Sequence, residues 1–110
     1  MPKIMVAGAR LSRGRGSPGV AFVRQALSLG YHVDAMDAYV KSEQLDSKID
    51  VFKPDSLISA SYDVAILFVP APNYVSIPTS LDETTKIIDL WGLWKESKQD
   101  SYFRLGNYFV

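Results

Sequence analysis

The sequence predicts an α/β fold, a three-layer sandwich in which helical segments cover both faces of a mainly parallel sheet of about five strands. Two observations predict this. Apolar segments of strand length alternate along the chain with segments of helical spacing, and residues 3–8 are apolar on both faces after Lys3. A strand with two apolar faces is typical of the centre of a parallel sheet. The length of 110 residues corresponds to one domain, residues 1–110.

A strand–helix–strand unit is expected in the first 37 residues. The helix should begin at Ser17, which can accept hydrogen bonds from free N–H groups of the first turn, and Pro18 suits that turn because it has no N–H to leave unpaired. Gly30 should end the helix, and the second strand should cover residues 31–36.

Further elements follow from shorter patterns. Residues 63–69 are β-branched, aliphatic or aromatic after Asp63 and are followed by Pro70, which predicts a buried strand with a sharp end. The remaining expected elements are a short strand near 49–52, a short helix over 54–60, helical turns near 80–84, a strand over 86–89 and a strand or extended tail over 102–110.

Composition excludes several kinds of function. The chain has no cysteine, which removes disulfides, zinc-thiolate sites and thiol nucleophiles. His32 is the single histidine, so we interpret it as a structural or surface residue and expect neither a catalytic triad nor a metal site. The formal net charge is zero, which argues against nucleic acid or an anionic membrane as a partner. Without a membrane-length apolar run or a signal peptide, a cytoplasmic location is expected.

The loop after the first strand carries Arg10, Arg13 and Arg15, and no acidic residue occurs before Asp34. Arginine binds phosphate oxygens through two parallel N–H hydrogen bonds, and the start of a helix offers free backbone N–H donors. We therefore expect a phosphate site formed by the three arginines and the backbone of Ser17 and Gly19, with Arg15 the strongest candidate.

Two other interpretations of this loop stay open. Residues 14–19 match the G-x-G-x-x-G pattern of dinucleotide-binding folds, with Asp37 as the ribose-binding acid. That pattern requires its first glycine directly after the strand, whereas five residues separate Gly8 from Gly14 here. The other interpretation is a surface loop whose arginines are solvated.

Three more candidates follow strands that should end at the ligand-binding edge of the sheet. Asn73 follows the strand over 63–69 and could bind a base or ribose, or belong to a plain turn. Asp89 ends the strand over 86–89 and either contacts a ligand or caps the next turn. Trp91 and Trp94 could stack on a base, form an interface or pack in the core, and packing is the default expectation.

Together these residues resemble the C-terminal, nucleotide-sugar-binding domain of the UDP-glucose/GDP-mannose dehydrogenase family. That family shows R-x-S-P before its first helix and D-P-Y-V after its second strand. The matching segments occur in the same order across nearly the whole chain: residues 15–18, 30–33, 37–40, 62–67, 86–92 and 102–106.

The resemblance implies a Rossmann-like domain that holds the UDP part of a UDP-sugar, beside a dimer partner and a separate NAD-binding domain. This chain departs from the family in a shorter first loop, where Arg10 and Arg13 replace a lysine and an aspartate. Trp91 stands where many members have a substrate-binding arginine. The family's nucleophilic cysteine lies in its other domains, so a chain without cysteine is not expected to oxidise a sugar alone, and NAD would come only through a partner domain.

The sequence thus predicts noncatalytic binding of a UDP-sugar or related nucleotide by a stand-alone domain, or by one part of a split or truncated UDP-sugar dehydrogenase. Its partner would be a second copy or a dehydrogenase chain. One alternative is a structural or interaction module that has lost its ligand. The other is a small enzyme of the nucleoside deoxyribosyltransferase type with Asp82 or Glu83 as the nucleophile.

Overall fold

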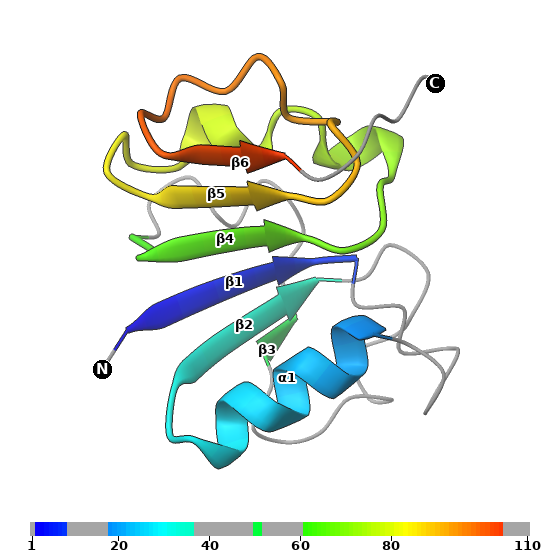
Figure 1. The fold of residues 1–110 in the computed structure, drawn as a ribbon, viewed down its shortest axis with the longest axis vertical. Helices are drawn as coiled ribbons and strands as arrows, with labels where there is room; N and C mark the ends of the chain where they lie inside the picture. The colour runs from blue at the N-terminus through cyan, green and yellow to red at the C-terminus, as the bar shows by residue number, and fades with distance from the viewer. Residues whose placement is uncertain (1, 9–17, 37–49, 52–60, 105–110) are drawn as a thin grey trace.

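The fold is taken from a computed structural model, in which residues 2–8, 18–36, 50–51 and 61–104 are described. This part of the chain contains six strands, one α-helix and two short 3-10 helices (Figure 1). In chain order they are β1 (Lys3–Ala7), α1 (Pro18–Ser28), β2 (His32–Met36), β3 (Asp50–Val51), β4 (Val64–Leu67), η4 (Pro72–Tyr74), η5 (Ile77–Ser80), β5 (Lys86–Asp89) and β6 (Tyr102–Arg104).

The strands form one sheet in the order β3-β2-β1-β4-β5-β6, and every neighbouring pair is parallel. Ile4 pairs with Val33 of β2 on one side and with Val64 of β4 on the other. The predicted α/β fold with a parallel, Rossmann-like sheet is therefore confirmed. The sheet has six strands rather than about five because the short edge strands β3 and β6 both pair with it.

Local predictions agree with the structure to within a few residues. The strand over 86–89 has the expected bounds, and β4 is shorter than the apolar run that predicted it. The expected helical turns near 80–84 begin earlier, as η5, and a separate turn closes where the Thr85 N–H donates to the Asp82 carbonyl at 3.1 Å. The helix expected over 54–60 lies outside the described residues.

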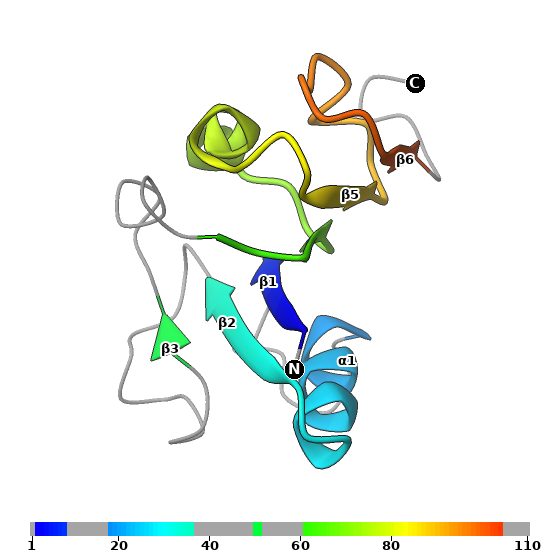
Figure 2. The same ribbon diagram turned by 90° about the vertical axis from the view of Figure 1, so that its left-hand side faces the viewer.

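Each face of the sheet has its own apolar cluster. Figure 2 shows the segments that cover the two faces. Helix α1 lies on one face, where its Val23 and Ala26 pack against Ile4 and Val6 of β1. The other face carries the connection that contains η4 and η5, and its cluster comprises Met5, Ala7, Met36, Tyr62, Ala65, Leu67, Ala71, Tyr74, Ile77, Leu81, Ile87 and Trp94. Alternate side chains of one strand thus enter different clusters, as two covered faces require. Among the described residues no helix is long and apolar enough to cross a membrane.

The strand order reverses between β1 and β4, because the chain builds outward through β2 and β3 on one side and through β5 and β6 on the other. At the carboxyl end of this central pair, the backbones come very close. Gly8 has φ +77°, and a Cβ atom added to it would overlap the backbone of Val69. The Gly8 N–H donates to the Met36 carbonyl at 2.8 Å, and the Phe68 N–H donates to the Ala7 carbonyl at 2.9 Å. Only glycine fits there.

Gly8→Ala should therefore destabilise the fold by at least about 2 kcal/mol, because alanine meets both the left-handed backbone and the Val69 backbone. Urea unfolding measures the change. Gly30→Ala is the matched control, because Gly30 also has a positive φ (+88°) but is exposed at the end of α1. This variant should lower the free energy of unfolding by about 1 kcal/mol. Equal losses in the two variants would contradict the close approach at Gly8.

Candidate functional site

All six strands point the same way, so their carboxyl ends share one edge of the sheet, here called the carboxyl edge (Figure 1). Helix α1 runs back against the strands and begins at this edge, where its Gly19 is buried in the first turn (Figure 1). Arg10, Arg13, Arg15 and Ser17, together with Asp37, lie outside the described residues.

Asp89 is the last residue of β5 and is fully buried. Its carboxylate accepts four hydrogen bonds. Oδ1 accepts from the backbone N–H of Trp91 at 3.1 Å and of Gly92 at 2.8 Å. Oδ2 accepts from the Trp94 backbone N–H and from the Tyr102 hydroxyl, both at 2.7 Å. Of the two expected roles of Asp89, the structure thus shows the capping role. The side chain fixes the turn after β5 and joins it to β6.

Trp91 is the exposed residue that this turn presents at the carboxyl edge. It is 42% exposed although tryptophan is the largest side chain, and its indole Nε1 donates to the Phe68 carbonyl at 2.6 Å. Because Phe68 follows β4, this bond joins the turn after β5 to the end of the neighbouring strand. The structure therefore brings the predicted site residues Asp89 and Trp91 together, with the indole held in one orientation.

Trp94 and Asn73 lie in the same region but differ in burial. Trp94 is 1% exposed, and its Nε1 donates to the Tyr74 carbonyl of η4 at 2.8 Å, so packing, the default expectation for both tryptophans, is confirmed for this one. Asn73 lies in η4 and is exposed. The bond from Trp94 to η4 places the segment that carries Asn73 beside the turn held by Asp89.

The surroundings of Tyr102, which include the Asp89 carboxylate, change the pKa of its hydroxyl group. Burial, the hydrogen bond to Asp89 and the charge of that carboxylate raise the pKa of Tyr102 far above its ordinary 10.0, and the charge of Arg104 offsets part of the effect. Tyr102 therefore stays protonated and acts as a hydrogen-bond donor over the whole physiological range.

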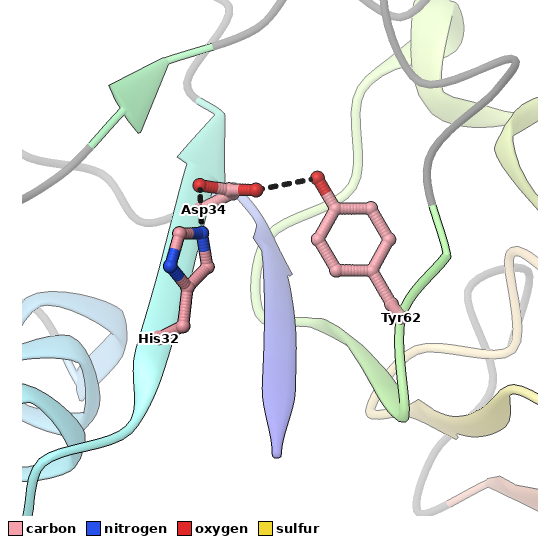
Figure 3. Close-up of polar contacts among 3 residues, drawn as sticks. All are labelled: His32, Asp34 and Tyr62. Carbon is pink, nitrogen blue, oxygen red and sulfur yellow. Dashed lines mark hydrogen bonds and ion pairs between the residues drawn. The ribbon is translucent and has the colours of Figure 1, made fainter. Parts of the chain in front are cut away.

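A second polar cluster lies on the sheet face away from α1 (Figure 3). Asp34, in the middle of β2, is 1% exposed. Its Oδ2 accepts from the Tyr62 hydroxyl at 2.7 Å, and its Oδ1 lies 3.1 Å from His32 Nε2. Tyr62 comes from the segment before β4 and reaches across β1, so the cluster ties this segment to β2.

Two members of this second cluster, Asp34 and Tyr62, are buried, and His32 is exposed. The His32 side chain is 52% exposed, which agrees with the expected surface histidine. Within residues 2–8, 18–36, 50–51 and 61–104, no three His, Cys, Asp or Glu side chains are grouped to hold a metal ion. Asp82 and Glu83, the carboxylates of the transferase alternative, precede β5 and so lie at the amino edge, opposite to Trp91. Asp82 there accepts a hydrogen bond from the Ser61 hydroxyl.

No family model and no curated protein sequence matches this chain. The assignment of the site therefore depends on the geometry of the carboxyl edge and on the residues that the sequence places there.

Sequence reasoning missed three members of these networks. Tyr62 entered only within a segment of the family resemblance and Tyr102 only as an aromatic position, and their hydroxyl partners lie far along the chain. Asp34 did carry a signal, because it is an acid between the apolar residues Val33 and Ala35 of an expected strand. A buried acid in such a strand predicts hydrogen-bonding partners, although it cannot name them.

The raised pKa of Tyr102 predicts a loss of stability in alkali. Below about pH 10 folded and unfolded chains both hold the Tyr102 proton, and the stabilisation is fully present. Above pH 10 the unfolded chain releases that proton while the folded chain keeps it, so the free energy of unfolding falls as the pH rises. In Tyr102→Phe, the free energy of unfolding should not show this part of the alkaline decline. At pH 7 the variant should be less stable than the wild type by about 1–3 kcal/mol, because phenylalanine cannot donate a hydrogen bond to the Asp89 carboxylate.

Urea unfolding of both proteins between neutral and alkaline pH measures the difference. Tyr31→Phe, which leaves the bond between Tyr102 and Asp89 intact, should follow the wild-type curve. Parallel alkaline declines in the wild type and Tyr102→Phe would show that Tyr102 does not keep its proton in the fold.

Proposed function

We propose that this chain binds a UDP-sugar or a related nucleotide at the carboxyl edge of its sheet, without converting that ligand by itself. The observation that carries the proposal is the reversal of strand order between β1 and β4. In open parallel sheets, ligands bind outside the carboxyl ends of the strands at such a reversal. The close approach of Gly8 to the Val69 backbone fixes the ends of β1 and β4 relative to one another at this location.

The phosphates are proposed to bind the arginines between β1 and α1. This connection leaves the sheet at Gly8 and enters the helix at Pro18, and both of these residues lie at the carboxyl edge (Figure 1). The sequence between them carries Arg10, Arg13 and Arg15 without any acidic residue. The three guanidinium groups and the free N–H groups at the start of α1 favour an anion with several oxygens.

The nucleotide-sugar part of the proposal comes from the resemblance to the dehydrogenase C-terminal domain. Oxidation of the sugar would require NAD and a cysteine, and this chain contains no cysteine. We therefore assign any such reaction to a partner chain that supplies both groups, while this chain contributes the UDP-binding surface. Asp89 would act in binding only through the turn that it holds, because its carboxylate is buried and already accepts four hydrogen bonds.

One observation favours the second candidate, an interaction module. Phe103 of the edge strand β6 is 60% exposed, beside the partly buried Ile88 with which it pairs in register. An exposed aromatic on an edge strand suits contact with another chain. Light scattering over a concentration series together with calorimetry on UDP distinguishes the two candidates, since an interaction module that has lost its ligand self-associates without a UDP binding heat, whereas a nucleotide-binding domain gives that heat.

Arg15→Ala should weaken binding of UDP and UDP-glucose by about 1.5–3 kcal/mol, the value of a hydrogen bond to a charged group. Isothermal titration calorimetry measures this loss. Arg24→Ala is the matched control, because Arg24 is an exposed arginine of α1 outside the loop, and its binding should equal that of the wild type. The proposal fails if the wild type gives no binding heat, or if Arg15→Ala binds as tightly as the wild type.

A further inference from the structure

We propose that Trp91 is a platform on which the planar base of the ligand stacks, so that the site selects ligands with an aromatic base over plain sugar phosphates. This inference rests on the proposed function, because it concerns the same edge of the sheet. The arginines are proposed to bind the phosphates, and Trp91 is the side chain that would recognise the base.

Trp91 is 42% exposed, and hydrogen bonds hold both its backbone and its indole ring. Its backbone N–H donates to Asp89 Oδ1 at 3.1 Å, and its indole Nε1 donates to the Phe68 carbonyl at 2.6 Å. Asp89 is itself fixed by three further donors, among them the Tyr102 hydroxyl of β6. A ring fixed before the ligand arrives loses little conformational entropy on binding, which favours affinity.

The position of the ring matches the proposed site. The Phe68 residue that accepts the indole bond also donates its own N–H to the Ala7 carbonyl at 2.9 Å. Ala7 is the last residue of β1, and Gly8 follows it. The Trp91 indole is thus linked through one residue to the reversal between β1 and β4, where a ligand of this kind of sheet is expected.

Packing does not account for Trp91 as it does for Trp94. Both tryptophans belong to the same short turn and both use the indole N–H on a backbone carbonyl. Trp94 is 1% exposed within the apolar cluster that contains Tyr74, whereas Trp91 is 42% exposed at the edge of the sheet. A large aromatic that is fixed by hydrogen bonds and still exposed has the properties of a stacking surface.

The hydrogen bonds also limit what Trp91 can recognise. Its two N–H donors are both used within the protein, so the ring offers a π face and no donor to the edge of a base. Stacking is tolerant of base identity because every base has a π face. Trp91 should therefore distinguish a ligand with a base from one without, and it should distinguish one base from another only by stacking strength and not by hydrogen bonds.

The test compares UMP with ribose 5-phosphate, which differ only in the uracil ring, by calorimetry on four proteins. The wild type should prefer UMP, and Trp91→Ala should lower UMP affinity roughly ten- to hundredfold while leaving the affinity for ribose 5-phosphate unchanged. Trp91→Phe keeps a smaller ring and should retain part of the preference. Phe103→Ala removes an aromatic that is 60% exposed on β6 and should behave as the wild type. Quenching of tryptophan fluorescence by UMP should disappear in Trp91→Ala.

Two different failures are distinguishable. If the wild type binds neither UMP nor ribose 5-phosphate, the proposed phosphate site itself is wrong, and the platform falls with it. If both ligands bind the wild type equally, or if Trp91→Ala weakens both or neither, the platform is overturned while the phosphate site stands. AMP should also lose affinity in Trp91→Ala, by at least as much as UMP because a purine has the larger ring face, and an AMP affinity that Trp91→Ala leaves unchanged would overturn the inference that Trp91 recognises a π face.

Discussion

The carboxylate of Asp89 is the interaction on which the candidate site depends. Burying a charge costs free energy unless hydrogen bonds replace the water, and Asp89 meets this requirement with four donors. Three of the donors are backbone N–H groups of the turn after β5, and the fourth is the Tyr102 hydroxyl of β6. The same carboxylate thus sets the turn, attaches the last described strand and fixes the orientation of Trp91.

Two groups of hydrogen bonds link the central strands: one uses backbone groups at the carboxyl edge, and the other uses side chains in the middle of β2. At the carboxyl edge, β1 and β4 approach so closely that only glycine fits at Gly8, and hydrogen bonds continue from Met36 through Gly8 and from Ala7 through Phe68 to Trp91. In the middle of β2, the Asp34 side chain accepts a hydrogen bond from the Tyr62 hydroxyl and so links β2 to the segment before β4. The first arrangement leaves an exposed aromatic beside a reversal of strand order, whereas the second buries Asp34 and Tyr62. This contrast is why we assign ligand binding to the carboxyl edge.

The fold was largely predictable because the apolar pattern of a parallel sheet is local. The both-sided burial of residues 4–7 and the apolar residues 64–67 place two central strands without tertiary information. The short strand expected near 49–52 is present as β3, whereas the early start of η5 was less accessible, since a backbone turn decides it. Likewise, Asp89 was recognised as an acid at a strand end, but its choice between ligand and cap depended on Tyr102, thirteen residues later. The different burial of Trp91 and Trp94 also depended on partners that the spacing of the two residues does not reveal.

The central claim is that the carboxyl edge, at the reversal between β1 and β4, is where a nucleotide binds. Chemical-shift mapping of a ¹⁵N-labelled sample during titration with UDP tests it most directly, because it reports on every backbone N–H and on both indole N–H groups. We expect the largest shifts at Gly8, Val69 and the Trp91 indole, with little change at the Trp94 indole and at Asp63 or Lys86 of the opposite edge. Saturable shifts centred on Asp63 and Lys86, or no shifts at all, would contradict it.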